Sequence, residues 1–408
     1  MLVVKIITTL LALATTFWAV YVLIIPLIAT LYLGFRSRSV HTPTLGERPR
    51  IAVIIPAHNM ELYIARCVDS ITACGYPDDR LDVYVTADHC IDRTGKFAAD
   101  CGATVLEREV EPRGKTYALG WTIEMLKGIG KAYDLFVIVD ATAKVDQGFL
   151  DGLVARWADG APIVVGHPVV DPENLRWFAR CLGLTLAHRN LQNWSRNAVG
   201  LSGFVGGRGM AYDKAYVERF GWSLALPTAE HGSSHPTEDW RHGVRVVEHG
   251  YKVAFAYGAK LYTPLRETLG AATEQGVRWE RGRLINMASH GFALFLRGVK
   301  ELDPLKIFAG LDATQPPVAV LTGVAIVVAA ASVLIPSWFA IPRLGVIPLA
   351  VMAFYSVAVV AQGRRDGIKA STILWAPFYI AWRCAAFVRA LASLGRSAVL
   401  DRLSLRRG

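Results

Sequence analysis

The sequence Ile51-Ala52-Val53-Ile54-Ile55-Pro56-Ala57-His58-Asn59 gives the clearest indication of the fold. It starts as a short apolar run, rich in β-branched side chains, that ends at a proline. Such a run is typical of a strand that is buried on both faces of a parallel sheet. The next segment, Glu61–Cys74, carries its apolar residues at helical spacing. The stretch therefore predicts the first strand and the first helix of an α/β domain.

The same alternation continues along the central part of the chain. Leu81–Ala87, Thr104–Glu107 and Leu135–Val139 are further apolar runs of strand length, and Thr116–Leu126 has helical spacing. Strands that alternate with helices favour a parallel sheet, which binds its ligands at the carboxyl ends of its strands. We therefore expect a soluble α/β domain over residues 48–285.

The apolar residues are concentrated at the two ends of the chain, although 53% of all residues are hydrophobic. Ile6–Leu33 contains no charged residue, and its length suffices to cross a hydrocarbon layer of about 30 Å. It is too long for the apolar region of a signal peptide. We expect a membrane anchor at residues 1–35, and the following Arg36 and Arg38 predict that the next domain is cytoplasmic.

The C-terminal region, residues 286–408, is predicted to return to the membrane. Val318–Ile335 and Leu344–Ala361 have the length and composition of spans. Thr372–Ala392 is apolar but contains Arg383 and Arg389, and a central arginine costs about 2.5–3.5 kcal/mol on insertion scales. For this segment a helix in the membrane interface is favoured over a third span, and residues 286–311 are a candidate for another such helix.

The net charge of +10 does not predict a nucleic-acid-binding protein. Many basic residues flank the apolar segments instead of forming a stripe within a folded domain, which is the pattern of the cytoplasmic side of a membrane protein. We expect membrane lipids as partners, and no nucleic acid.

Acidic and basic residues stand where a parallel sheet would bind a ligand. Asp88 and Asp140 each close a predicted strand, where a carboxylate could contact a nucleotide or hold a divalent metal; capping of a turn is the alternative. Arg113-Gly114-Lys115 precedes a predicted helix and suits phosphate binding, although an ordinary basic turn has the same composition.

Two later motifs carry groups suited to catalysis. In Thr237-Glu238-Asp239 a carboxylate could act as a base, or the residues could simply cap the helix predicted at Trp240–His249. In Gln275-Gly276-Val277-Arg278-Trp279 the Gln, Arg and Trp side chains can share one helical face. Arginine would clamp a diphosphate and tryptophan would support a sugar ring, or both would be membrane-interface anchors.

The order and spacing of these motifs resemble the family 2 glycosyltransferases of GT-A fold. The likeness is strongest to the membrane-bound branch of cellulose, hyaluronan and poly-N-acetylglucosamine synthases, ceramide glucosyltransferase and bacterial exopolysaccharide transferases. The resemblance implies nucleotide or donor contacts by Pro56, Ala57, Asn59, Glu61, Asp88, Arg113, Lys115, Asp140, Gly207 and Gly209. It further implies that Asp239, beside Glu238, is the catalytic base, and that Gln275, Arg278 and Trp279 contact the diphosphate and the acceptor.

One motif departs from the family pattern. The metal-binding D-x-D of the family is here Asp140-Ala141-Thr142, so a hydroxyl replaces the second carboxylate. The resemblance implies Mg²⁺ or Mn²⁺ at Asp140, with Thr142 as a second candidate ligand that binds more weakly than aspartate. The alternatives are that Arg113, Lys115 and Arg278 carry more of the leaving-group charge, or that activity is reduced or lost.

The resulting expectation is an inverting glycosyltransferase of the bacterial inner membrane with a cytoplasmic catalytic domain. It would move a sugar, from a UDP-sugar in the first instance, to a hydroxyl of a lipid, lipid-linked or polysaccharide acceptor and form a β-linkage. A processive polysaccharide synthase and a non-catalytic nucleotide-binding subunit of a synthase are the alternatives.

Overall fold

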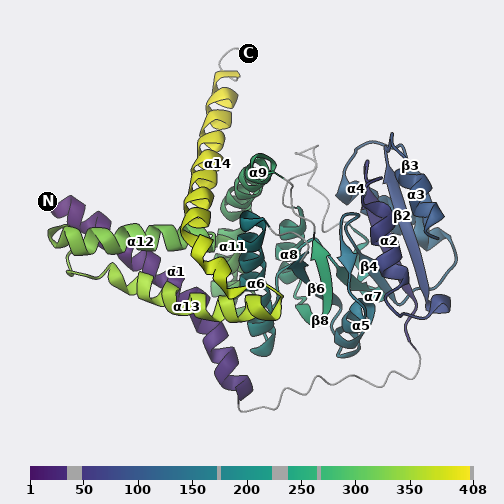
Figure 1. The fold of residues 1–408 in the computed structure, drawn as a ribbon, viewed down its shortest axis with the longest axis horizontal. Helices are drawn as coiled ribbons and strands as arrows, with labels where there is room; N and C mark the ends of the chain where they lie inside the picture. The colour runs from purple at the N-terminus through teal and green to yellow at the C-terminus, as the bar shows by residue number, and fades with distance from the viewer. Residues whose placement is uncertain (35–47, 172–175, 223–237, 264–267, 405–408) are drawn as a thin grey trace.

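The computed structural model describes residues 1–34, 48–171, 176–222, 238–263 and 268–404, without the side chains of residues 33–34, 238 and 395–404. The sheet and the helices that cover it lie at one end of the molecule, and α1, α12 and α13 lie at the other (Figure 1). Arg36, Arg38 and Thr237, and the side chain of Glu238, fall outside the described parts.

The described residues form one mixed sheet in the order β3-β2-β1-β4-β7-β6-β8-β5. Strands β1 to β4 are parallel, β7 is antiparallel to both β4 and β6, and β6 is parallel to β8. The strands are β1 (Ile51–Ala57), β2 (Leu81–Asp88), β3 (Thr104–Arg108), β4 (Leu135–Ile138), β5 (Lys144–Val145), β6 (Ile163–Val170), β7 (Met210–Asp213) and β8 (Val253–Thr263).

The four predicted strands are confirmed, but the expectation of a parallel sheet is correct for one half only. The second half contains antiparallel neighbours because β7 enters between β4 and β6. A short strand such as Met210–Asp213 follows a glycine-rich turn and has no distinctive apolar run, so its direction could not be inferred from periodicity.

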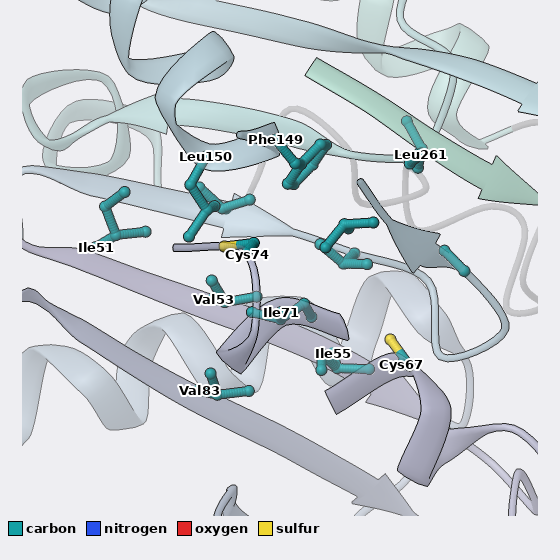
Figure 2. Packing of buried hydrophobic residues seen from close by; sticks show 14 of the residues in the cluster. Ile51, Val53, Ile55, Cys67, Ile71, Cys74, Val83, Phe149, Leu150 and Leu261 are labelled. Carbon is teal, nitrogen blue, oxygen red and sulfur yellow. The ribbon is translucent and has the colours of Figure 1, made fainter. Parts of the chain in front are cut away.

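The core of the sheet explains why the opening sequence is so apolar. Ile51, Val53 and Ile55 are fully buried on one face, where they pack with residues of the covering helix such as Ile71 and Cys67 (Figure 2). The alternate residues Ala52 and Ile54 are equally buried in a second cluster on the other face. A strand covered on both faces needs apolar side chains at every position, as β1 has.

The helices that follow the strands agree with the predicted segments, with shifted ends. The helices are α1 (Leu2–Gly34), α2 (Ile64–Thr72), α3 (Thr94–Asp100), α4 (Lys115–Gly128), α5 (Phe149–Ala158), α6 (Trp177–Ala198), α7 (Lys214–Phe220), α8 (Glu238–Glu248), α9 (Leu269–Asn286), α10 (Phe292–Glu301), α11 (Pro304–Thr314), α12 (Val318–Leu334), α13 (Val346–Arg365) and α14 (Ala376–Ser404). Long helices α6 and α9 lie between the sheet and the terminal helices (Figure 1).

Three described helical segments are long and apolar enough to cross a membrane: Leu2–Tyr32, Val346–Arg365 and Ala370–Leu394. Helix α12 meets this criterion together with α11 as a pair bent by 69°. The last of the three segments includes the one expected to lie in the interface, so its length and composition also allow a span. Its Arg383 is nearly buried and pairs with Glu280 of α9, which offsets the cost of the charge.

A buried polar network fixes the sheet to the C-terminal end of α13. His167 of β6 contacts the carboxylate of Asp366 through Nε2 at 2.9 Å and the carbonyl of Tyr257 through Nδ1 at 2.7 Å. Asn190 of α6 donates to the same carboxylate at 3.2 Å, and Gln362 donates to it at 2.9 Å. Because buried polar groups need partners, this network holds the two parts of the chain in one relative position.

Candidate functional site

A cavity of about 450 Å³, here called the central cavity, lies between the sheet and helices α6, α8, α9 and α14. Seven residues singled out in the sequence line it although they come from five separate segments of the chain. They are Lys115, Asp140, Gly207, Asp239, Gln275, Arg278 and Trp279. The structure therefore brings the acidic strand end, the basic loop, the proposed base and the α9 motif to one place.

The remaining predicted residues do not line the central cavity. Pro56, Ala57, Asn59, Glu61, Asp88 and Arg113 belong to the turns at the carboxyl ends of β1 and β2 and to the loop before α4. Gly209 and Thr142 lie beside the cavity residues in sequence but are also not part of its lining.

The carboxylate of Asp140 is held between two cations. The Lys115 ammonium pairs with one oxygen and also donates to the carbonyl of Gly207 at 2.8 Å. The Nε of Arg208 lies 3.7 Å from the other oxygen. Both cations face the cavity, so they can move from the carboxylate to the phosphates of a bound ligand. The importance of Arg208, which stands within the glycine-rich segment, was not inferred from the sequence.

Because Gly207 has no side chain, its backbone can lie directly against the proposed base, Asp239. Its φ of +68° is in the left-handed region, and a Cβ built on it would lie 2.6 Å from Oδ2 of Asp239. The other oxygen, Oδ1, accepts the backbone N–H of Trp240 at 2.9 Å, which fixes the carboxylate at the start of α8. Asp239 is thus oriented by one oxygen while Oδ2 lies against the Gly207 backbone.

Helix α9 brings the Gln275, Arg278 and Trp279 side chains to the same wall, as the helical spacing predicted. Arg278 is exposed and has no hydrogen bond or ion pair to another described residue, and Trp279 is half-buried. An arginine with no partner among the described residues is available for a phosphate, and an adjacent indole is a flat surface for a sugar.

Asp88 connects the end of β2 to the basic loop before α4. Its carboxylate accepts hydrogen bonds from Arg108 at 2.6 Å, from His89 at 3.0 Å and from the backbone N–H of Gly114 at 3.1 Å. Burial alone would raise the pKa of Asp88, but the hydrogen bonds from Arg108, Gly114 and His89 outweigh it and hold the pKa below its usual range. These donors use three of the carboxylate's roughly four acceptor sites, so Asp88 positions the loop that carries Lys115.

The turns after β1 and β2 are bound to each other. Asn59 accepts the backbone N–H of Ile91 through its side chain at 2.9 Å, and the carboxylate of Glu61 accepts the backbone N–H of Arg93 at 3.2 Å. Arg113, in contrast, is exposed and directed to Glu111 at 2.8 Å. The first two motifs therefore form one rim of the sheet's carboxyl edge, and none of their residues lines the central cavity.

The donor atoms that could hold a divalent metal are few. Among the described residues no group of three or more His, Cys, Asp or Glu side chains is arranged to do so. Asp140 supplies one carboxylate, and Mg²⁺ commonly binds through one or two carboxylates together with substrate phosphates and water. Asp140 thus fits a metal that is held largely by substrate phosphates. Thr142 is half-buried, lies outside the cavity lining and adds no charge.

Besides Arg208, four charged residues of the central cavity were not identified as site residues from the sequence: Arg189, Glu280, Arg283 and Arg383. Burial and the neighbouring Arg283 lower the pKa of Arg189 to about 10, so its side chain is a cation at neutral pH. Arg383 could have indicated these residues from the sequence, because a charged side chain within an apolar segment needs a buried partner. Glu280 is that partner.

The chain is similar to known proteins both in sequence and in fold. The family model described as "Glycosyltransferase like family 2" matches residues 49–282. The probable glycosyltransferase YdaM of Bacillus subtilis (strain 168) is 43% identical over 255 residues, which are 58% of this chain and 56% of that protein. The chain thus matches little more than half the length of this relative.

Among solved structures, the chain resembles a mannosyltransferase of Pyrobaculum calidifontis in complex with GDP-Man and Mn²⁺. The TM-score is 0.58 at 19% identity, and the match covers 94% of this chain and 99% of that one. Glucosyl-3-phosphoglycerate synthase of Mycobacterium tuberculosis matches 57% of this chain and 78% of its own at 20% identity, with a TM-score of 0.37. The first likeness extends over the sheet domain and the flanking helices, and it confirms the expected GT-A fold.

Proposed function

Because the chain belongs to the family 2 glycosyltransferases, we propose that it transfers a sugar, with inversion, from a nucleotide-sugar to a hydroxyl group of an acceptor at a membrane. The acceptor class that we favour is a lipid or a lipid-linked glycan. The observation that carries the proposal is the convergence of Lys115, Asp140, Asp239, Arg278 and Trp279 on the central cavity.

Asp239 is the base of the proposed reaction. Its carboxylate takes the proton of the acceptor hydroxyl, whose oxygen forms a bond to the anomeric carbon of the donor sugar. The bond from that carbon to the phosphate oxygen breaks, and the nucleoside diphosphate leaves with the electron pair. Attack from the side opposite the leaving group inverts the configuration, so that an α-linked donor gives a β-linkage. Trp279 supports the acceptor sugar or head group beside the base.

The charge of the leaving diphosphate is met by cations that already line the cavity. Asp140 holds Lys115 and Arg208 at the cavity wall where we expect the diphosphate, and Arg278 faces the same cavity from α9. Fixed charges of this kind stabilise the developing negative charge without reorganisation. A divalent metal, bound by Asp140 and the donor phosphates, would add Lewis-acid stabilisation of the same charge.

The location and the donor are part of the proposal. The candidate spans at both ends of the chain support a membrane protein with residues 1–35 and 286–408 as its membrane parts. The basic residues Arg36 and Arg38 after the first span support a cytoplasmic side for residues 48–285. A UDP-sugar is the donor that we favour. GDP-sugars belong in the same screen, because the P. calidifontis neighbour binds GDP-Man.

The experiment that tests the proposal compares the wild type with Asp239→Asn in purified form. The asparagine keeps a side-chain oxygen for the Trp240 N–H but cannot take a proton. We expect transfer to fall by at least about a hundredfold while UDP or GDP binding, measured by calorimetry, stays within a few-fold of wild type. Normal turnover in the variant would remove Asp239 as the base. Sizing of the product separates single additions from the long chains of a processive synthase.

A further inference from the structure

A second cavity, here called the helix cavity, lies next to the central cavity. Its volume is about 190 Å³, and most of its lining residues belong to α6, α9, α11, α12, α13 and α14. More of its wall is apolar than polar, with Leu184, Val318, Val360 and Ile380 among the lining residues. Helix α13 and the segment Ala370–Leu394 are candidate spans, so this apolar space lies between helices suited to a lipid bilayer.

Several polar side chains of the helix cavity are already bonded to protein. His188 contacts the hydroxyl of Tyr355 at 2.6 Å, and Asp312 pairs with Arg196 of α6. The hydroxyl groups of Thr322 and Ser356 bond to carbonyls of their own helices at 2.8 Å. These groups therefore have little need of a polar ligand, and the space suits a hydrocarbon chain better than a sugar.

The wall shared by the two cavities is charged. Seven residues line both, and three of them are the arginines Arg189, Arg283 and Arg383, against the single carboxylate of Glu280. Glu280 pairs with Arg383, and its second oxygen lies 3.7 Å from Nε of Arg283. Arg189 has no hydrogen bond or ion pair to any described residue, and the wall as a whole has an excess of positive charge. An anionic group at this place would compensate it.

We propose that the acceptor is a lipid that carries both a phosphate and a free hydroxyl in its head group. Its hydrocarbon chain occupies the helix cavity, and its phosphate lies against Arg189 and Arg283. The hydroxyl then extends into the central cavity toward Asp239, which lines the same space. This inference rests on the proposed function and names the chemical class of its acceptor.

The chemistry of this acceptor is consistent with the proposed step. The lipid hydroxyl loses its proton to Asp239 and gains the sugar, while the donor loses its nucleoside diphosphate. The phosphate of the lipid does not react. It is a recognition group, and the arginines position it so that the hydroxyl reaches the anomeric carbon.

The first test identifies the class of the acceptor from the product. Membranes that contain the full chain are incubated with radiolabelled nucleotide-sugar, and the labelled product is partitioned into organic solvent and applied to an anion-exchange column. We expect label that is soluble in the organic phase, retained on the column, and released from it after chemical cleavage of the phosphate. A labelled product that is neutral, or that stays in the aqueous phase, would overturn the acceptor assignment and leave the proposed function intact.

Failure of the proposed function has a different signature. If no nucleotide-sugar is bound, hydrolysed or transferred by the same membranes, the glycosyltransferase proposal fails and the acceptor assignment fails with it. Donor hydrolysis by the purified chain, followed as release of UDP or GDP without added acceptor, is therefore measured in parallel.

Variants then locate the lipid, with extracted anionic lipid as the acceptor. Arg189→Gln is expected to raise the KM for this lipid about tenfold or more, a loss of about 1.4 kcal/mol. The matched control is Arg281→Gln, at an exposed arginine of α9. Equal KM values for the two variants would remove Arg189 from the acceptor site.

The chain-binding part is tested on one helix. Val360→Phe of α13 fills the helix cavity, whereas Val357→Phe adds the same volume at a side chain that is 68% exposed. The first is expected to raise the KM for the lipid about tenfold and the second to leave it unchanged, with the KM for the donor measured alongside. If Val360→Phe does not fold, Ala319→Val narrows the same cavity from α12. Unchanged lipid KM in a folded cavity-filling variant would contradict the proposal.

Discussion

Gly207 and Asp239 are in contact in a way that leaves no room for a side chain at position 207, because a Cβ there would lie 2.6 Å from Oδ2 of the carboxylate. The two residues are 32 positions apart in the sequence, and the glycine-rich turn after α6 meets the start of α8 at this point. The carbonyl of the same glycine accepts a hydrogen bond from Lys115. One backbone unit therefore positions both the proposed base and a cation of the diphosphate site.

The first prediction is that Gly207→Ala displaces the base. The added methyl group must push Asp239 away, so kcat is expected to fall about a hundredfold, because small displacements of reacting groups have effects of this size. Nucleotide binding is expected to change far less, since most cations of the cavity stay in place. Steady-state kinetics and calorimetry with UDP or GDP measure the two quantities.

A second glycine is the control for this variant. Gly200→Ala imposes the same left-handed strain, at φ +81°, where no atom lies within 4 Å of the added methyl group. It is expected to keep most of the activity. If Gly200→Ala loses as much kcat as Gly207→Ala, backbone strain is the cause and the steric explanation is wrong.

The second prediction concerns the metal. Thr142→Asp restores a second carboxylate two residues after Asp140 and is expected to tighten Mn²⁺ binding in the presence of UDP or GDP by about tenfold, or about 1.4 kcal/mol. Thr142→Asn, of similar size but without charge, is the control. The affinity is measured by electron paramagnetic resonance of free Mn²⁺. Equal affinity of the two variants would mean that position 142 does not face the metal.

The sequence predicted the parallel half of the fold because its strands carry a strong and continuous signal. Ile51–Ala57 is apolar throughout, since both of its faces are covered, and it is bounded by clear turn residues. Strand β7 gives no such signal: its pairing with β4 and β6 is long-range and depends on how Gly207–Gly209 turns the chain. Local periodicity contains no information on that pairing.

The site residues divide in the same way into those predictable from local sequence and those that depend on long-range packing. Residues in short motifs, such as Arg278 and Trp279, were identified because their spacing on one helix is a local property. Arg189 and Arg283 belong to no motif, and they become site residues through the packing of α6 against α9 around a cavity. Asp88 shows the opposite case, because its strand-end position was correctly predicted while its partners Arg108 and Gly114 are known only from the structure.

The third prediction follows from the lowered pKa of Asp88. A carboxylate whose pKa is lower in the folded than in the unfolded state stabilises the fold when it is ionised. This stability is fully present above the ordinary value of 3.8 and is lost as the pH falls through the lower folded value. Asp88→Asn is therefore expected to lower the melting temperature at pH 7. The melting temperature of the variant is also expected to decrease less than that of the wild type as the pH falls from 5 to below 3.8.

The control for this prediction is Asp100→Asn, at an exposed aspartate near the end of α3. It is expected to follow the wild-type melting curve at each pH. The melting temperature is recorded by intrinsic fluorescence in a neutral detergent. An Asp88→Asn protein with wild-type stability at pH 7 would contradict the assignment of Asp88 as a buried, ionised partner of Arg108.

The fourth prediction tests the packing of α10 on α11, the two helices that lead from α9 to the terminal apolar segments. Gly310 of α11 lies against the backbone of α10, where a Cβ would be 2.5 Å from Cα of Phe295. Gly298 of α10 makes the reciprocal contact, at 2.5 Å from the backbone nitrogen of Ile307. Neither contact can be relieved by rotation of a side chain, so Gly310→Ala is expected to destabilise the protein by about 1–3 kcal/mol or more.

The matched control is Gly270→Ala in the first turn of α9, where no atom lies within 4 Å of the added methyl group. Alanine is a better helix former than glycine, by about 0.5–1 kcal/mol in a helix interior, so this variant is expected to be neutral or more stable. The two substitutions are identical in chemistry and should have opposite effects on the melting temperature. Because α11 also supplies Asp312 and Ala313 to the helix cavity, Gly310→Ala should raise the KM for the lipid acceptor as well. A Gly310→Ala protein that melts at or above the temperature of Gly270→Ala would mean that the two helices are not packed this closely.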